Sequence, residues 1–412
     1  MREGWKEVEL REITDVINGF AFKSKDFVES GIPLIKIKEI KENRINLSAC
    51  SFLPSNFKLN EKFTVKKGDV IIALTGSHIT LPSSAVGRVA MSYIDDVLFL
   101  NQRVGKFKVD ENKADLNYLY FFLSSEYFFN SVGLMAKGAA NQANISGDDI
   151  KSLKINLPPL ETQRKIASIL SGYDDLIENN LKRIKILEEM AQQTYEEWFV
   201  RMRFPSYETA VMNEETGLPE GWGKKTLIDL GKISTGKTPS TLNEDFYNGN
   251  IPFIKTPDMN GSSYVIETNQ YLTKLGSDNQ KGKLIEKNSL VVSCIGSAGA
   301  FALVSKPSQF NQQINAITFK REEYIFFTYC YSKSLKEKLE ALGSNGATMT
   351  NVNKTKFEKI EIVLPDSQLL NKFHKIFKLN FENILNLQSQ NQRLREARDL
   401  LLPRLMMGIL EV

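Results

Sequence analysis

The stretch Leu157–Phe204 reads LPPLETQRKIASILSGYDDLIENNLKRIKILEEMAQQTYEEWFVRMRF, and it decides the fold. No proline interrupts it between Pro159 and Pro205. We therefore expect one helix of roughly 40 residues, about 60 Å long. Its apolar residues recur about every 3.6 residues, the period of an α-helix, at Ile166, Leu170, Tyr173, Ile177, Leu181, Ile184, Leu187, Ala191, Tyr195 and Trp198.

A second long stripe follows Leu364-Pro365, near the other end of the chain. Its sequence, DSQLLNKFHKIFKLNFENILNLQSQNQRLREARDLLLPRLMMGIL, has the same apolar period, with Asn391 and Arg398 as two polar members. Polar residues in such a seam normally set the register of a helix pair or lie at its rim. Because neither stripe is short enough to be covered by one compact domain, we expect the two helices to pack as an antiparallel coiled coil.

The composition is that of an ordinary folded protein. A length of 412 residues predicts two or three domains, and a net charge of +4 permits a nucleic-acid partner without demanding one. The cysteines Cys50, Cys294 and Cys330 are far apart and only two histidines exist, so we expect neither disulfides nor a metal site. The N-terminus has no signal-peptide core, and no window is apolar enough to span a membrane. We expect a cytoplasmic protein.

The two halves of the chain repeat one order of landmarks. Gly221-Trp222 follows Gly4-Trp5 by 217 positions, and IPFIKT at Ile251 matches IPLIKI at Ile32. Short β-branched runs in both halves predict strands, and so long a period indicates a duplicated domain. We expect an α+β protein with an internal pseudo-two-fold repeat, divided into domain 1 (1–157), a central helix (158–204), a linker (205–220), domain 2 (221–364) and a C-terminal helix (365–412).

Two local patterns in the first half predict helices. The aromatic block Leu116–Val132 has helical spacing and predicts one core helix. The acid pair Asp148-Asp149 has no catalytic partner in the sequence. Acidic residues are favoured at turns and in the first turn of a helix, so we expect a structural role for this pair.

No catalytic grouping is visible, and we do not expect an enzyme. The segment GKISTGKT, Gly231–Thr238, matches a phosphate-binding loop letter for letter. However, Pro239 follows at once, and the first copy has DVINGFAF at the matching place. We expect a glycine turn here, and a nucleotide hydrolase using Gly236-Lys237-Thr238 is an unfavoured alternative.

Amide, hydroxyl and basic side chains gather at predicted turns in both copies. Such groups bond base edges and phosphates. Each alone is more simply a loop cap, but their clustering at matching places favours a DNA-binding surface. The candidates in the first domain are Lys36, Lys38, Ser77, His78, Arg88, Asn101, Gln102, Arg103, Lys137, Asn141, Gln142 and Asn144. Those in the second are Lys255, Ser297, Asn311, Gln312, Gln313, Asn351 and Asn353.

The chain resembles the specificity subunits of type I restriction-modification systems. The resemblance rests on LPPLETQRKIASILSGYDDLIE from Leu157, EEWFVRMRFP from Glu196, the linker ending LPEGW at Trp222, and LREARDLLLPRLMMGIL from Leu394. It implies a non-catalytic, sequence-specific DNA-binding subunit with two target recognition domains. Each domain would read one half of a split, asymmetric target, with the paired helices as spacer. A coiled-coil scaffold that does not bind DNA is the alternative.

The resemblance also implies partners. Two methyltransferase subunits would dock on the chain and restriction or translocase subunits would join them, so S-adenosylmethionine, ATP and magnesium would belong to those partners. The aromatic end of the first helix, Tyr195, Trp198 and Phe199, is expected either to be covered by the second domain or to contact the methyltransferase. One departure is that DSQLLNKFHKIF, at the start of the second helix, lacks the ETQRKI lettering of the first.

Overall fold

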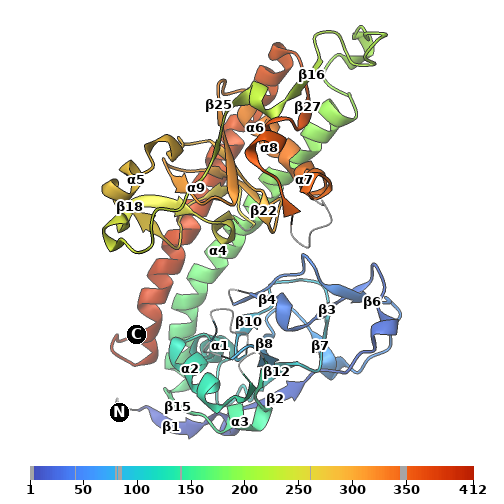
Figure 1. The fold of residues 1–412 in the computed structure, drawn as a ribbon. Helices are drawn as coiled ribbons and strands as arrows, with labels where there is room; N and C mark the ends of the chain where they lie inside the picture. The colour runs from blue at the N-terminus through green and yellow to red at the C-terminus, as the bar shows by residue number, and fades with distance from the viewer. Residues whose placement is uncertain are drawn as a thin grey trace. The chain divides into compact units, whose positions relative to one another are not determined.

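The computed structural model describes residues 4–41, 43–78, 81, 86–139, 142–259, 261–343 and 350–412 (Figure 1). The chain divides into two compact units. Unit 1 comprises Met1–Glu178 with Leu394–Val412, and unit 2 comprises Asn179–Arg393. Each unit therefore contains one mixed α/β domain and a part of both long helices.

Two long helices form where the apolar stripes predict them. The first, α4 (Leu160–Tyr195), continues as a π-helical turn over Glu196–Val200. The second, α9 (Ser367–Met406), includes Pro403 in its last turn. Among the described residues, neither these nor any other helix is long and apolar enough to cross a membrane.

The two helices run antiparallel, as expected, and unit 2 alone shows it. Asn180 Nδ2 donates a hydrogen bond to Asn391 Oδ1 at 2.9 Å, and both side chains are buried. In the π-helical turn that continues α4, the ring of Trp198 lies 6.0 Å from the ring of Phe373. As the residue number rises along the first helix, the number of the residue that it contacts on α9 therefore falls, as antiparallel packing requires.

The buried seam of α4 differs from the predicted stripe. Asp174 and Asn180 are buried, whereas Leu181 is only half-buried. Inside unit 1, Arg398 forms an ion pair with Asp174, while Asn180 pairs with Asn391 in unit 2. Both polar members of the α9 stripe therefore meet a polar partner on α4, which an apolar period cannot reveal.

Unit 1 is built on four sheets. The six-stranded sheet has the order β2 (Thr14–Asn18), β12 (Val104–Val109), β8 (Val70–Ala73), β10 (Val89–Met91), β5 (Arg44–Ile45) and β4 (Ile40–Lys41). The four-stranded sheet has the order β6 (Ser51–Leu53), β3 (Ile32–Ile35), β11 (Leu98–Leu100) and β7 (Thr64–Val65). The small sheets are β13 (Lys137–Ala139), β14 (Gln142–Asn144) and β9 (Thr75–Gly76), and the pair β1 (Lys6–Glu9) and β15 (Lys154–Leu157).

The aromatic block of unit 1 forms two helices, α1 (Leu116–Leu123) and α2 (Glu126–Met135), where one was predicted. Ser125 separates them because its hydroxyl accepts a hydrogen bond from the Phe128 amide at 3.2 Å and caps α2. A short helix, α3 (Gly147–Lys151), follows β14. The aromatic spacing thus marked helical residues correctly but could not show the break.

Unit 2 repeats this order, which confirms the duplication. Its five-stranded sheet has the order β17 (Gly231–Thr235), β25 (Ile314–Phe319), β21 (Leu290–Ser293), β23 (Phe301–Val304) and β19 (Tyr264–Val265). The smaller sheets are β20 (Tyr271–Leu272), β18 (Tyr247–Ile254) and β24 (Gln309–Phe310), then β22 (Ile295–Gly296) with β26 (Thr350–Asn351), and β16 (Gly223–Thr226) with β27 (Glu361–Leu364). The helices of its domain are α5 (Lys274–Asp278), α6 (Tyr324–Tyr331), α7 (Leu335–Gly343) and α8 (Lys354–Glu358).

Each unit has a core that includes segments of both long helices. In unit 1, Ile166 and Leu170 of α4 and Leu405 of α9 belong to one cluster with Phe128. In unit 2, Phe373, Phe377 and Phe381 of α9 belong to one cluster with Tyr195 and Phe327, among others. Burying a large apolar side chain stabilises a fold by about 1.5–3 kcal/mol, so the helix segments are integral to their units.

Candidate nucleic-acid interface

Three short segments meet at one edge of unit 1. The Leu74 amide donates to the Arg103 carbonyl at 2.9 Å, and the Ile145 amide donates to the Leu74 carbonyl at 2.9 Å. These bonds bring together residues that are widely separated in sequence. We define the turn edge of unit 1 as residues 75–78, 101–103 and 142–144.

Unit 2 builds the same edge from the equivalent residues. The Cys294 amide donates to the Gln313 carbonyl at 2.8 Å, and the Val352 amide donates to the Cys294 carbonyl at 3.0 Å. The turn edge of unit 2 is accordingly residues 295–297, 311–313 and 350–351. Most of the predicted base readers therefore gather at one matching place in each unit.

An asparagine closes the central turn of each edge. Asn101 Oδ1 accepts from the Arg103 amide and Asn311 Oδ1 accepts from the Gln313 amide, each at 3.2 Å. Both asparagines are buried, with 8% and 7% of their surface exposed. Their side chains hold the turn, which leaves the exposed Gln102 as the reader candidate next to the first of them.

A glycine lies against each of these turns. A Cβ on Gly19 would meet the Asn101 carbonyl oxygen at 2.2 Å, and a Cβ on Gly236 would meet the Asn311 carbonyl oxygen at 2.2 Å. Real Cβ atoms do not approach so closely, so only glycine permits the contact. This close approach explains the glycine repeated at matching places in the two halves.

The exposed side chains of the turn edges can reach a ligand. In unit 1 these are Gln102, Arg103, Gln142 and Asn144, and Lys137 lies opposite Asn144 on β13. In unit 2 they are Gln312, Ser297 and Asn351. Ser77, His78 and Gln313 are half-buried, and Asn141 lies outside the described residues.

The predicted phosphate-binding cations differ in availability. Lys36 Nζ donates to Ser51 Oγ at 2.8 Å, and Lys38 Nζ donates to the Ala49 carbonyl at 2.7 Å. These two ammonium groups are thus engaged within unit 1. Lys255 is half-buried, with Nζ 5.9 Å from the centre of the Phe253 ring.

Two further candidates lie beside the turn edges. Arg88 is half-buried, and its carbonyl accepts from the Ala73 amide at 2.9 Å. Asn353 is exposed and caps α8, because its Oδ1 accepts from the Lys356 amide at 3.0 Å. The cap gives Asn353 a structural function in unit 2.

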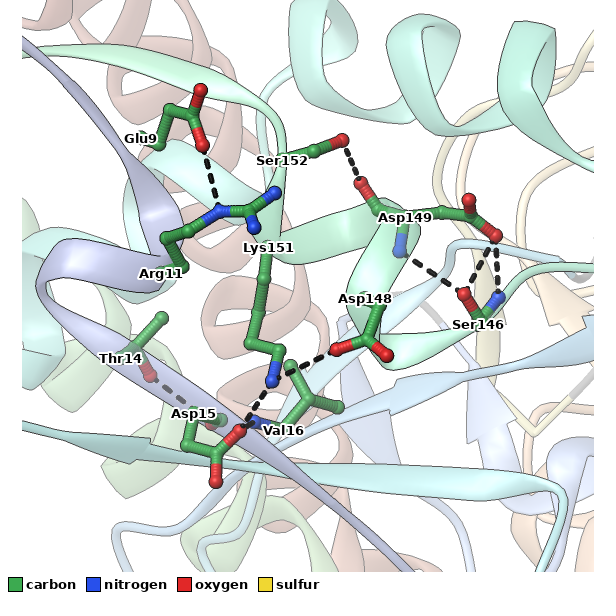
Figure 2. A network of polar contacts seen from close by, with 10 residues as sticks. All are labelled: Glu9, Arg11, Thr14, Asp15, Val16, Ser146, Asp148, Asp149, Lys151 and Ser152. Atoms are coloured by element: carbon green, nitrogen blue, oxygen red, sulfur yellow. Dashed lines mark hydrogen bonds and ion pairs between the residues drawn. The ribbon is translucent and has the colours of Figure 1, made fainter.

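Figure 2 shows the polar network of α3, the helix that follows β14, and the bonds that join α3 to β2 in unit 1. The Asp149 amide donates to Ser146 Oγ at 3.0 Å, and the carboxylate of Asp149 accepts from the Ser146 hydroxyl and amide, which lowers its pKa. Lys151 Nζ bonds Asp15 on β2 at 2.9 Å, which lowers the pKa of Asp15, and also bonds Asp148 at 3.1 Å. The Asp148-Asp149 pair was expected at a turn or at the start of a helix, and it lies in the first turn of α3.

The segment Gly231–Thr238 of unit 2, which matches the sequence motif of a phosphate-binding loop, does not form such a loop. Gly231–Thr235 is strand β17, so the first glycine lies within a sheet. No helix begins directly after Thr238 among the described residues, and the next regular element is the 3-10 turn Glu244–Phe246. A phosphate-binding loop requires a helix N-terminus directly after the motif, so the nucleotide-hydrolase alternative lacks its structural basis.

Among the described residues, no group of three or more metal-ligating side chains is close enough to hold an ion. Burial raises the pKa of the Cys294 thiol, next to the turn edge of unit 2, to about 12. A thiol with so high a pKa is protonated and poorly nucleophilic.

The aromatic end of α4 lies in the core of unit 2. Tyr195 and Phe199 are buried, and the Phe199 ring packs edge-on against Phe327 at 5.0 Å and Phe373 at 5.2 Å. Trp198 is half-buried. Of the two roles expected for these residues, coverage by the second domain is the one observed for Tyr195 and Phe199. A methyltransferase contact stays a prediction for Trp198.

Sequence reasoning did not name Phe20, which follows the first edge glycine, and considered Lys237, which follows the second, only as part of a phosphate-binding loop. Phe20 and Lys237 occupy equivalent positions, because their amides donate to the Leu100 and Phe310 carbonyls at 2.8 and 3.0 Å. Both side chains are exposed beside a turn edge. The signal that could have found them is the glycine shared at positions 19 and 236.

Comparison with known proteins identifies the family. The family model of the type I restriction modification DNA specificity domain matches residues 2–189 and 219–392. The chain is 30% identical to the HindI specificity subunit of Haemophilus influenzae, covering 98% of this chain and 99% of that one. It is 27% identical to the MjaIX specificity subunit of Methanocaldococcus jannaschii, covering 99% and 94%. The chain belongs to the type I restriction-modification specificity subunits.

A solved structure shares the fold. The type I restriction-modification S subunit of M. genitalium matches 97% of this chain and 96% of its own length with a TM-score of 0.58, at 18% identity. The tandem recognition domains and paired helices described above are therefore features of a known architecture. The two matched segments of the family model also correspond to the two internal copies.

Proposed function

We propose that this chain binds a split, asymmetric DNA target, with one half-site read at the turn edge of each unit. The observation that carries the proposal is that one scaffold carries different side chains at matching positions of its two copies, with Arg103 exposed and Gln313 half-buried. Gln102 and Arg103 stand where unit 2 has Gln312 and Gln313. Since base identity is read by donors and acceptors in the major groove, unlike edges select unlike half-sites.

The side chains of the two edges suit major-groove contacts of different kinds. An exposed arginine can bond guanine through two donors, whereas a glutamine can bond adenine through a donor and an acceptor. Arg103 extends from a turn that its own amide helps to close, so its backbone is fixed before DNA arrives. We therefore expect the first half-site to depend on Arg103 more strongly than the second depends on Gln313.

We further propose that the chain is non-catalytic and acts with methyltransferase subunits. S-adenosylmethionine, and ATP with magnesium where restriction subunits take part, would be bound by those partners. Support comes from the binding chemistry of the turn edges and from the relatives, which are named specificity subunits of restriction enzymes. Trp198 is a candidate docking residue because part of its surface stays open beside a rigid aromatic core.

A groove in unit 1 is a second candidate for docking. It has a volume of about 830 Å³ and lies where α9 ends, with Tyr127, Leu402, Met406 and Met407 among its lining residues. Tyr127 and Met407 are 64% and 63% exposed. Aromatic and methionine side chains of this kind are enriched at protein interfaces. Met406→Arg and Trp198→Ala should each weaken methyltransferase binding, which co-purification at defined salt measures.

Domain exchange tests the DNA-binding proposal. Residues 1–157 are replaced by those of a relative, the chain is produced in cells with its methyltransferase, and methylated bases are mapped by methylome sequencing. One half-site should change while the other is retained. For two domains reading the major groove from one face, half-site centres should lie about one turn apart, roughly 10 base pairs. A continuous palindrome, or a change in both halves, would contradict the proposal.

The scaffold alternative predicts a different result in a simpler assay. Phosphate neutralisation makes DNA affinity fall steeply with salt. The complex of this chain with its methyltransferase should therefore shift target DNA in a salt-dependent way, and the methyltransferase alone should do so far more weakly. Equal binding with and without the chain would favour a scaffold.

A further inference from the structure

The segment Gly236–Thr238 of unit 2 is the part of the false phosphate-loop motif that the proposed function has not used. We propose that it completes the turn edge of unit 2 on DNA, with Lys237 contacting a backbone phosphate and Thr238 positioning the Gln312 amide. The inference rests on the proposed function and deepens it for one half-site.

The backbone holds this segment against the turn edge. The Gly236 amide donates to the Ile314 carbonyl at 3.2 Å, and the Lys237 amide donates to the Phe310 carbonyl at 3.0 Å. These bonds bracket the turn formed by residues 311–313. Because Gly236 leaves no room for a Cβ beside the Asn311 carbonyl, the segment lies directly on that turn, and the two following side chains start from fixed positions.

Thr238 orients the amide of Gln312. Its hydroxyl donates to Gln312 Oε1 at 2.6 Å, and the glutamine is otherwise exposed. With one lone pair of Oε1 engaged, the Nε2 hydrogens are the groups that this side chain presents outward. An amide held this way favours a base atom that accepts, such as guanine O6 or N7, adenine N7 or thymine O4 in the major groove.

Lys237 supplies a cation beside that reader. Its side chain is exposed, and no carboxylate within the described ranges forms an ion pair with it. A lysine ammonium acts on phosphate as a compact point charge that needs no fixed geometry. Neighbouring phosphate and base contacts are the usual division of labour at a DNA interface, the first positioning and the second specifying.

Unit 1 provides an internal control for this reasoning. Phe20 and Ala21 occupy the positions of Lys237 and Thr238, since Gly19 and Gly236 make the same approach to their turns. Neither replaces the charge or the hydroxyl. The inference therefore applies to the second half-site alone, and Gln102 is expected to discriminate less strongly between bases than Gln312.

The test uses the full chain in complex with its methyltransferase. Thr238→Val removes the hydroxyl at nearly constant shape, and Thr238→Ser retains it. We expect Thr238→Val to lose about tenfold discrimination at one position of the second half-site, measured from relative methylation of oligonucleotides with single base changes. Thr238→Ser should keep the wild-type preference, and the first half-site should be unaffected in both variants.

The charge is tested in parallel by the salt dependence of binding. Lys237→Gln should reduce the slope of log affinity against log salt by about 0.9, the contribution of one phosphate contact, without changing base preference. Lys232→Gln is the matched control, because Lys232 is exposed on β17, the strand that precedes Lys237, and it should leave the slope unchanged.

The outcomes separate this inference from the proposed function. If the wild-type complex methylates a split target while Thr238→Val keeps full discrimination and Lys237→Gln keeps the slope, the inference is overturned and the proposed function stands. If Thr238→Val alters both half-sites, the assignment of this segment to one of them is overturned. If the wild-type complex has no split target, the proposed function itself fails.

Discussion

Removing Arg398 should destabilise unit 1 strongly, because it would leave a carboxylate buried without its counter-ion. Asp174 is 2% exposed, its Oδ1 pairs with Arg398, and its Oδ2 is buried without a hydrogen-bond partner. Deleting one member of a buried pair typically costs about 3–5 kcal/mol. Arg398→Met deletes the charge but keeps much of the side-chain volume. The measured loss of stability should therefore come mainly from the unpaired carboxylate and not from a cavity.

The expected fall in melting temperature follows from this loss of free energy and from the size of unit 1. Its segments of 178 and 19 residues make 197 residues, and a domain of that size loses roughly 2–4 °C per kcal/mol. We expect unit 1 of Arg398→Met to melt about 6–20 °C lower in differential scanning calorimetry. The double variant with Asp174→Leu should regain most of the loss, since replacing both partners by apolar residues is often neutral.

The loss should also depend on pH. Burial raises the pKa of Asp174 in the folded state, and the Arg398 charge opposes that rise. A raised carboxyl pKa means that the folded state binds the proton more tightly than the unfolded state, so the destabilisation is present above the folded pKa and fades as pH falls through it. The deficit of Arg398→Met should therefore shrink on acidification. A deficit that does not shrink on acidification, or a double variant no more stable than the single one, would refute the reasoning.

Three further expectations concern the seam, the second turn edge and α4. Asn391→Leu should cost about 1–3 kcal/mol in urea unfolding because it leaves Asn180 buried without a partner, and pairing it with Asn180→Leu should recover stability. Gly236→Ala would place a Cβ 2.2 Å from the Asn311 carbonyl oxygen, so methylome sequencing should show recognition of the second half-site lost. Burial raises the pKa of Glu188, so Glu188→Gln should stabilise the chain at neutral pH, and the gain should vanish as pH falls through the folded pKa, where the wild-type carboxyl is protonated.

The long helices were predictable because their apolar residues recur with the period of an α-helix along the sequence. Their polar contacts were not, because a seam is defined only when both helices are in register. The apolar period of α4 alone predicts that Asp174 and Asn180 face solvent. Their burial is explained only by their partners on α9, which are Arg398 for Asp174 and Asn391 for Asn180. Predicting the buried seam therefore requires knowing which residues of the two helices face each other, and the apolar period of one helix does not give this information.

The turn edges show a similar division. Matching clusters of amides in the two halves predicted where polar side chains would gather, and the structure brings those segments together. The sequence could not show that Asn101 and Asn311 are buried turn-closing residues while Gln102 and Gln312 are exposed. That distinction depends on backbone hydrogen bonds between distant segments, and neighbouring amides in one turn look equivalent without them.

The duplication itself offers a way to separate scaffold from specificity within this single chain. Positions that must satisfy the same backbone geometry carry the same residue in both copies, as glycine does at 19 and 236 and asparagine does at 101 and 311. The outward residue that follows each of these glycines differs, with Phe20 in unit 1 and Lys237 in unit 2. If the edges bind DNA, exchanging an outward residue between the copies should transfer a base or phosphate preference without loss of stability. Replacing a scaffold residue should instead lower the free energy of unfolding. Equal effects at both kinds of position would show that the outward residues are also structural.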